Sequence, residues 1–166
     1  MIPVKLRGST GEIAMKPIAA LAFAAGLMTA APALAQDHWI AHSAQVAAVD
    51  AAVRAPLEAY LTGHATGAQE AFRAAFHPDA ELWGTRNGAL IRMTAEEYVG
   101  RASGAPAADE AQRRRWIESV EVVGDTAYAK IVLDYPAVRF TDWMTLMKID
   151  GRWLIVNKAF LAEPKG

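Results

Sequence analysis

The 166-residue sequence contains no cysteine, which excludes disulfide bonds, cysteine-ligated zinc, thiol catalysis and a lipid anchor on a cysteine. It also lacks an excess of charge of one sign, because 17 basic and 18 acidic residues leave a formal net charge of −1. Such a chain has no field strong enough to gather nucleic acid or acidic lipid, so neither is an expected partner. With 53% hydrophobic and 21% charged residues, the composition is that of a globular protein.

Long hydrophobic runs are also missing. The uncharged core at residues 18–28 is far shorter than the roughly 20 residues of a membrane-spanning helix, and Pro32 interrupts its extension. Lys16 precedes this core and the small-residue triplet Ala33-Leu34-Ala35 follows it. The pattern predicts a Sec-type signal peptide over residues 1–35. We therefore expect a periplasmic or secreted protein that has no lipid anchor and no membrane contact after the signal is removed.

The remaining chain is predicted to hold one domain, over residues 44–161. A flexible N-terminal segment, 36–43, is expected before it and a tail, 162–166, after it. Met15-Lys16 is a typical beginning of a signal peptide, so the sequence leaves open whether translation starts there and residues 1–14 are not made.

Helical periodicity dominates the first part of the predicted domain. Apolar residues at three- and four-residue steps predict an amphipathic helix over 44–62, with Ser43 as its N-cap and Gly63 as its end. Pro56 inside this helix removes one hydrogen bond. We expect a kink there, the alternative being a regular helix that begins near Ala55.

Two further helices are predicted from capping boxes, in which a Thr and a Glu or Gln three residues later satisfy each other's backbone amides. Thr66-Gly67-Ala68-Gln69 opens a short helix to about Ala75, and Thr94-Ala95-Glu96-Glu97 opens another to about Arg101.

Strands separated by turn residues make up the rest of the chain. Asn87-Gly88 joins two short strands in a tight hairpin, and turns at Gly124-Asp125, Pro136 and Asp150-Gly151 separate four longer ones. The predicted strands are 80–84, 89–93, 115–123, 126–135, 139–149 and 152–160. Together the elements predict an α+β fold, with three N-terminal helices packed on a curved antiparallel sheet that consists of a short hairpin and a four-strand meander.

Several motifs along residues 44–161 carry a family resemblance. They are Tyr60-Leu61-x-Gly63, Phe76-His77-Pro78-Asp79-Ala80, Thr94-x-x-Glu97-Tyr98, Gly124-Asp125-Thr126-Ala127, Phe140–Leu146 and Asp150–Lys158. The set resembles the nuclear-transport-factor-2-like superfamily and, within it, the SnoaL-like and lumazine-binding-like group. The resemblance implies a cone-shaped fold with a cavity between the helices and the concave sheet. That superfamily includes isomerases, cyclases, dehydratases, ligand binders and dimerisation modules, so the fold does not settle the function.

Strand pairing indicates which residues face the expected cavity. A two-residue turn at Asp150-Gly151 sets Met144 opposite Asn157 and Asp142 opposite Ala159. Asp142 and Asn157 then share the inner face with apolar residues. A bulge between Arg139 and Ile149 would send Asp142 outward.

A second carboxylate is predicted on the same face. The turn at Gly124-Asp125 sets Glu118 opposite Ile131, beside Trp116 on an otherwise apolar face. If Ile131 also pairs with Asp142, the two carboxylates lie about 9–10 Å apart, two strand spacings, with room for a small ligand between them.

These arguments define the candidate site. The predicted ligand-binding residues are Tyr60, Trp83, Glu118, Ile131, Asp142, Met144 and Asn157. Asp142 or Glu118 is the candidate base and Tyr60 the candidate hydrogen-bond donor to an oxyanion. Each also has a structural interpretation, with Asp142 holding Asn157 or a helix end, Glu118 at a frayed strand edge and Tyr60 in the core. On the functional interpretation, Asp142→Ala weakens binding by about 1–3 kcal/mol and largely keeps the fold.

Three functions remain open. We rank first an exported small-molecule-binding protein with an internal pocket, whose ligand the sequence does not identify. The alternatives are an acid–base enzyme of the isomerase, cyclase or dehydratase type, and a dimeric assembly module. No cofactor and no metal are predicted, because no phosphate-binding loop or zinc motif occurs. A homodimer is expected through the outer sheet face, formed by Trp143, Thr145, Met147, Leu154, Val156 and Phe160.

Overall fold

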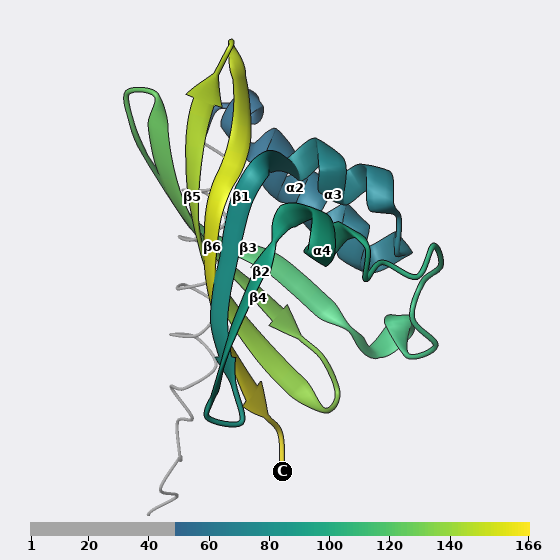
Figure 1. The fold of residues 1–166 in the computed structure, drawn as a ribbon. Helices are drawn as coiled ribbons and strands as arrows, with labels where there is room; N and C mark the ends of the chain where they lie inside the picture. The colour runs from purple at the N-terminus through teal and green to yellow at the C-terminus, as the bar shows by residue number, and fades with distance from the viewer. Residues whose placement is uncertain (1–48) are drawn as a thin grey trace, which may run out of the picture. The chain divides into compact units, whose positions relative to one another are not determined.

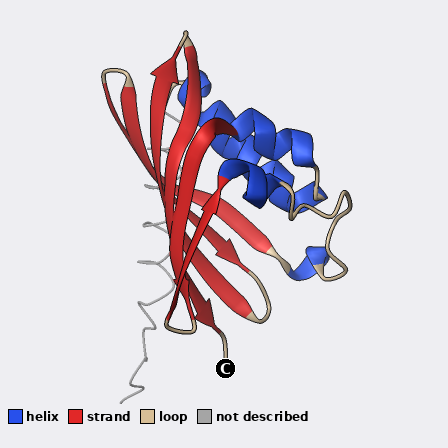
Figure 2. Ribbon diagram, viewed as in Figure 1, coloured by secondary structure: helices blue, strands red, loops and turns tan. Residues whose placement is uncertain are grey.

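The computed structural model describes residues 49–166, in which three α-helices cover one face of a six-stranded sheet (Figures 1 and 2). The predicted signal peptide, the segment 36–43 and the proposed cap Ser43 lie outside the described residues. None of the described helices is long and apolar enough to cross a membrane. Below, the inner face is the side of the sheet that the helices cover, and the outer face is the opposite side.

The first described helix, α2, spans Ala51–Thr66. Asp50 is its N-cap, and the carboxylate accepts a hydrogen bond from the backbone N–H of Ala52 at 2.7 Å. The prediction of one continuous helix from residue 44 is therefore wrong. Pro56 lies inside α2, in its second turn, so the alternative start near Ala55 is wrong as well.

The end of α2 also differs from the prediction. Gly63 does not terminate the helix but lets α3 approach, because a Cβ atom there would lie 2.7 Å from the Phe72 ring. Gly67 is the C-cap, with a left-handed φ of 70° that favours glycine.

The two shorter helices differ in whether the predicted capping box forms. α3 spans Gln69–Ala75 and ends as predicted, but its N-cap is Ala68, and the Thr66 hydroxyl donates to a carbonyl of α2 instead. The expected capping box before α3 is therefore wrong. α4 spans Ala95–Val99, shorter than predicted, and its capping box with Thr94 is confirmed in both directions.

The sheet has the strand order β2-β1-β6-β5-β4-β3. All neighbouring strands are antiparallel except β1 and β6, which are parallel. The strands are β1 (Phe76–Arg86), β2 (Ala89–Thr94), β3 (Arg114–Val123), β4 (Thr126–Asp134), β5 (Val138–Ile149) and β6 (Arg152–Pro164), with a 3-10 helix at Glu110–Gln112 before β3. β6 continues to Pro164, into the residues expected to form a tail.

Two register shifts decide which side chains face inward. In β3, Ile117 pairs with Ile131 and Ser119 with Lys130, so Glu118 is an extra residue in a bulge. The prediction that Glu118 pairs with Ile131 is therefore wrong.

In β6, the register shifts after Ile155 pairs with Leu146, because the next pair joins Asn157 to Thr145. Val156 is the extra residue, and every later residue of β6 changes face. Met144 consequently lies opposite Lys158, and Asp142 lies opposite Phe160. Both predicted partners, Asn157 and Ala159, are wrong.

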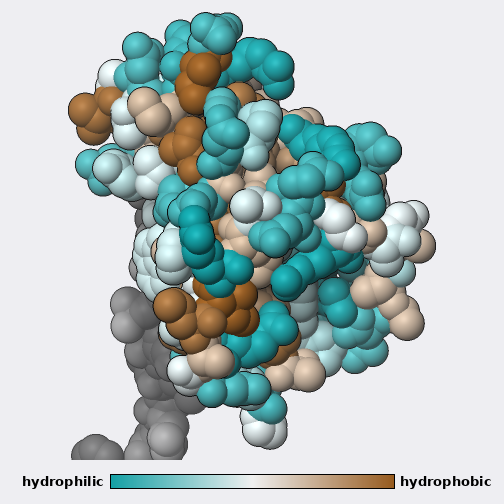
Figure 3. Space-filling view, in the orientation of Figure 1, coloured by the Kyte–Doolittle hydropathy of each residue, from teal (hydrophilic) through white to brown (hydrophobic). Residues whose placement is uncertain are grey.

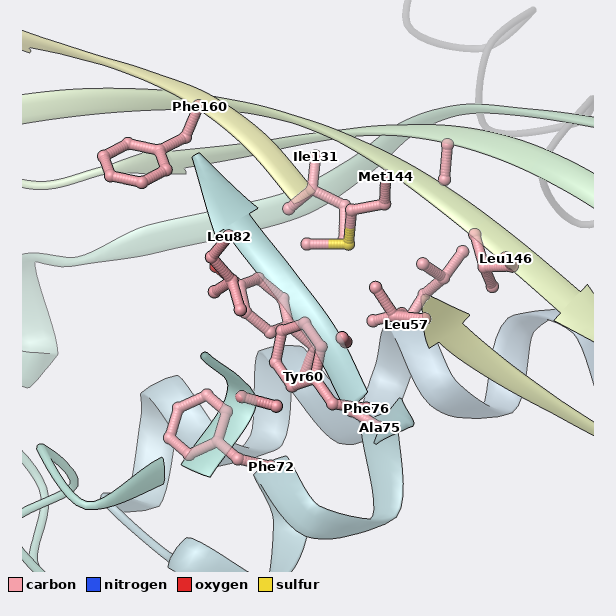
Figure 4. Packing of buried hydrophobic residues seen from close by; sticks show 14 of the residues in the cluster. Leu57, Tyr60, Phe72, Ala75, Phe76, Leu82, Ile131, Met144, Leu146 and Phe160 are labelled. Carbon is pink, nitrogen blue, oxygen red and sulfur yellow. The ribbon is translucent and has the colours of Figure 1, made fainter. Parts of the chain in front are cut away.

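The core lies between the helices and the inner face. Figure 4 shows the Tyr60 ring between Phe72, from α3, and Leu82, from β1. Tyr60 makes edge contacts with Phe72 and Phe76 and is completely buried. The helices show a mostly hydrophilic surface to solvent in Figure 3, where hydrophobic groups gather toward the upper and lower ends of the sheet.

The outer face keeps only part of its predicted set. Trp143 and Met147 are exposed there as expected. The prediction that Phe160 lies on the outer face is wrong, because the bulge at Val156 turns this side chain inward, where it is buried. Leu154 is also buried rather than exposed.

Candidate functional site

A cavity of about 270 Å³ opens between α2, α4 and the inner face of the sheet. Its lining residues are His64, Arg86, Met93, Tyr98, Arg101, Leu133, Phe140, Lys158 and Phe160. Four of these carry a basic side chain and none is acidic. The cavity therefore combines aromatic and aliphatic walls with a positive charge balance.

Lys158 lies on the wall of this cavity because the bulge at Val156 turns it inward. It is only 4% exposed. Its Nζ donates to the Tyr60 hydroxyl at 2.9 Å and lies over the rings of Tyr98 and Phe160, at 4.7 and 4.9 Å from their centroids. Burial lowers the pKa of Lys158, and the nearby Asp142 carboxylate acts in the opposite direction.

Asp142 lies behind Lys158 and is completely buried. It faces inward, as predicted, and it pairs with Ile131 across β4 and β5, a pairing that the sequence left open. Its Oδ2 accepts a hydrogen bond from the Tyr60 hydroxyl at 2.7 Å and lies 3.5 Å from Lys158 Nζ, while Oδ1 has no hydrogen-bond partner within residues 49–166. Asp142 is not among the residues that line the cavity. The carboxylate is thus a buried counter-charge to Lys158.

A chain of hydrogen bonds links this pair to the far side of the cavity. The Tyr98 hydroxyl donates to that of Tyr60 at 3.1 Å and contacts His64 Nε2 at 2.7 Å, while Tyr135 contacts His64 Nδ1 at 3.2 Å. The chain is satisfied when His64 is neutral, donates from Nε2 to Tyr98 and accepts from Tyr135 at Nδ1.

The protonation states agree with this assignment. Burial, with the charges of Lys158, Arg115 and Arg113, lowers the pKa of His64 well below its usual value. Burial and the Asp142 charge raise the pKa of Tyr60 and of Tyr98 well above theirs. All three groups are therefore neutral at pH 7, beside the Lys158–Asp142 pair.

The structure brings together only part of the predicted site. Tyr60 and Asp142 are in contact, and Ile131 and Met144 are buried on the inner face beside Asp142. Sequence reasoning missed Lys158, which alternation from the Asp150-Gly151 turn would place on the outer face.

Three predicted residues lie elsewhere. Glu118 forms an ion pair with Lys130 at 2.7 Å on the outer face, because it occupies the bulge of β3. Trp83 donates its indole N–H to the Glu81 carboxylate, and Asn157 donates to the Glu81 carbonyl. Asn157 lines a separate outer-face groove of about 420 Å³. Among residues 49–166, no three His, Asp or Glu side chains lie close enough together to hold a metal ion.

Comparisons with known proteins agree with the fold. The model of a family described as "Putative lumazine-binding" matches residues 48–161. The chain is also similar to the aldolase FrzH of Cladobotryum sp., with 24% identity over 116 residues, which are 69% of this chain and 91% of that protein.

Solved structures with similar folds include two NTF2-like proteins of unknown function. One is from Silicibacter pomeroyi DSS-3, with 27% identity, a TM-score of 0.60, and 68% of this chain and 94% of that chain covered. The other is from Methylobacillus flagellatus KT, with 28% identity, a TM-score of 0.59, and 70% and 96% covered.

Proposed function

Because the chain belongs to the lumazine-binding-like family of NTF2-like proteins, we propose that it binds a small organic molecule in its internal, cone-shaped cavity. The observation that carries this proposal is the cavity itself, whose apolar walls surround one buried basic group, Lys158. A concave, mostly apolar site with few polar groups is the usual form of a small-molecule site.

The lining also indicates the chemical class of the ligand. Arg86 and Arg101 lie at the exposed part of the cavity and Lys158 at its buried part, with no acidic residue between them. An organic anion with a flat apolar body fits these charges best. The geometry gives less support to an enzyme with a carboxylate base, because Asp142 does not line the cavity and Glu118 lies on the outer face.

We expect benzoate to bind this cavity about tenfold more tightly than its neutral analogue benzamide, since a charge-assisted hydrogen bond contributes about 1.5–3 kcal/mol. Amide chemical shifts in a two-dimensional NMR titration measure both affinities and locate the site. Arg101→Gln should reduce the binding of benzoate but not of benzamide. Arg152→Gln, at the opposite hairpin, is the matched control. Equal affinities would contradict the anion preference, and no shift with either compound would contradict the proposed site.

Self-association is the second part of the proposal. Seven large hydrophobic side chains are exposed on the outer face, a set we call the outer-face patch: Trp83, Leu90, Val123, Tyr128, Trp143, Met147 and Leu161. A contiguous apolar patch on a sheet face is typical of an interface, and a second copy of the chain would cover it symmetrically.

Sedimentation at micromolar concentration should therefore give a dimer, and Trp143→Arg should give a monomer, because it places a charge in the middle of the patch. Val122→Arg is the control, since Val122 is also exposed but lies on the inner face of β3, outside the patch. A monomeric wild type, or a dimer that survives Trp143→Arg, would count against this interface.

We also propose that the domain acts in the periplasm or outside the cell. The support for this compartment is the predicted signal peptide over residues 1–35, whose apolar core is too short to span a membrane.

A further inference from the structure

Lys158 differs from the other lysines of the described domain in its surroundings. Lys130, Lys148 and Lys165 lie in contact with solvent, and Lys130 and Lys165 pair with the carboxylates of Glu118 and Asp134. Lys158 is almost completely buried, and it lines the cavity. Any molecule in the cavity therefore meets a primary amine on the wall.

The contacts around Nζ favour an amine that can give up its proton. Three aromatic rings surround it, from Tyr60, Tyr98 and Phe160, and their faces solvate a cation less well than water does. Burial lowers the pKa of Lys158, so a larger share of this amine is neutral at pH 7 than at an exposed lysine. A neutral amine has the free electron pair that a nucleophile needs.

Asp142 and Tyr60 provide a route for that proton. The Tyr60 hydroxyl accepts from Lys158 Nζ at 2.9 Å and donates to Asp142 Oδ2 at 2.7 Å. A proton can thus pass from Nζ to the carboxylate through one hydroxyl group. Asp142 also lies close enough to balance a positive charge that reappears on the nitrogen.

From this geometry we propose that Lys158 condenses with the carbonyl group of an aldehyde or ketone ligand to form an imine. The proposal rests on ligand binding in the same cavity and names the class of ligand. The electron pair of Nζ forms a bond to the carbonyl carbon, and one proton passes from the nitrogen to the carbonyl oxygen to give a neutral carbinolamine. The hydroxyl group of the carbinolamine then takes up the proton that Asp142 received through Tyr60 and leaves as water, while the electron pair of the nitrogen forms the C=N bond. The product is a protonated imine beside the Asp142 carboxylate, and nothing is oxidised or reduced.

The two arginines of the cavity further restrict the class of ligand. Arg86 and Arg101 line the same cavity as Lys158, so a molecule with a carbonyl at one end and a carboxylate at the other satisfies both ends. 4-Carboxybenzaldehyde has these two groups on one ring. Terephthalate keeps the ring and the charge but has no aldehyde, so it is the matched control ligand.

The test is reductive trapping of the full domain with 4-carboxybenzaldehyde and cyanoborohydride at pH 7, followed by peptide mass spectrometry. Lys158 should be labelled faster than the exposed Lys148, since burial lowers the pKa of Lys158 and raises the share of its amine that is neutral. Terephthalate should slow the labelling of Lys158 and not of Lys148.

Three variants distinguish an effect on the imine chemistry from an effect on folding. Lys158→Arg should abolish the selective label, while Lys148→Arg should leave it unchanged, with circular dichroism recorded for both. Tyr60→Phe keeps Lys158 but removes the hydroxyl beside Nζ, and it should slow the labelling severalfold even where the thermal unfolding temperature changes little.

Labelling of Lys158 no faster than that of Lys148, in protein that still binds benzoate, would overturn the imine and leave the proposed binding site standing. Selective labelling of Lys158 in protein that does not distinguish benzoate from benzamide would support the imine and count against the anion preference.

Discussion

Replacing Asp142 with leucine is expected to destabilise the domain by about 3–5 kcal/mol, because it leaves the buried ammonium of Lys158 without its counter-charge. The Tyr60 hydroxyl loses its acceptor in the same variant. The sequence alone predicted a different effect, in which Asp142→Ala weakens ligand binding and largely keeps the fold. The structure places Asp142 behind the cavity wall, so its removal acts on folding first.

A double-mutant cycle separates the interaction energy of Asp142 and Lys158 from the effects of each substitution on the surrounding packing. Lys158→Met alone should also be destabilising, because Asp142 is then buried with only the Tyr60 hydrogen bond. The double variant Asp142→Leu, Lys158→Met should recover most of the loss, since replacing both buried charges with apolar groups is often neutral or stabilising. Urea unfolding at pH 7 measures all four free energies.

The pair Arg54–Glu58, 3.4 Å apart on α2, provides the control, because Glu58 is exposed and Arg54 is half-buried. Glu58→Leu should change the free energy of unfolding by no more than about 0.5 kcal/mol. An Asp142→Leu variant as stable as Glu58→Leu would show that Lys158 is not held by this carboxylate. Additive losses in the double variant would show that the two charges do not interact.

The strands and their turns were largely predictable, because a tight hairpin is specified by the two residues at its tip. Asn87 and Asp150 both have positive φ, at 51° and 50°, and each precedes a glycine with positive φ. The register next to these turns followed directly, as in the pair of Leu146 and Ile155.

The site was less predictable, because alternation fails beyond a bulge. Neither Glu118 nor Val156 is a glycine or a proline that would mark one, and a bulge depends on how neighbouring strands bend against the core. Asp142 was placed on the correct face because β5 itself contains no extra residue between it and the turn. Lys158 was missed because the extra residue lies in β6.

The position of His64, unlike that of Lys158, could have been predicted from the sequence. It lies four residues after Tyr60, so on a helix the two side chains share one face. The prediction that the helix ends at Gly63 placed His64 outside it and removed that inference. In the structure α2 continues to Thr66, and the two rings are 4.7 Å apart.

His64 should make the stability of the domain depend on pH below about 6.5. Burial and the charges of Lys158, Arg115 and Arg113 hold the pKa of His64 in the folded state well below the unfolded value, while the facing hydroxyls of Tyr60, Tyr98 and Tyr135 are neutral. Between the folded and the unfolded pKa, the unfolded chain binds more protons. The stability due to His64 is therefore complete above about pH 6.5 and is lost as the pH falls through the folded pKa, with a slope of up to about 1.4 kcal/mol per pH unit.

His64→Gln tests this directly, because glutamine can still bond to Tyr98 and Tyr135 but does not titrate. Urea unfolding from pH 7.5 to 5 should show wild type and variant converging as the pH falls, since only the wild type must keep an imidazole neutral. His77→Gln is the matched control for a histidine substitution, because His77 lies at the start of β1 outside the cavity lining. Parallel curves for His64→Gln would contradict the assignment of a neutral His64, and with it the direction of the hydrogen bonds that join His64 to Tyr98 and, through Tyr60, to Lys158.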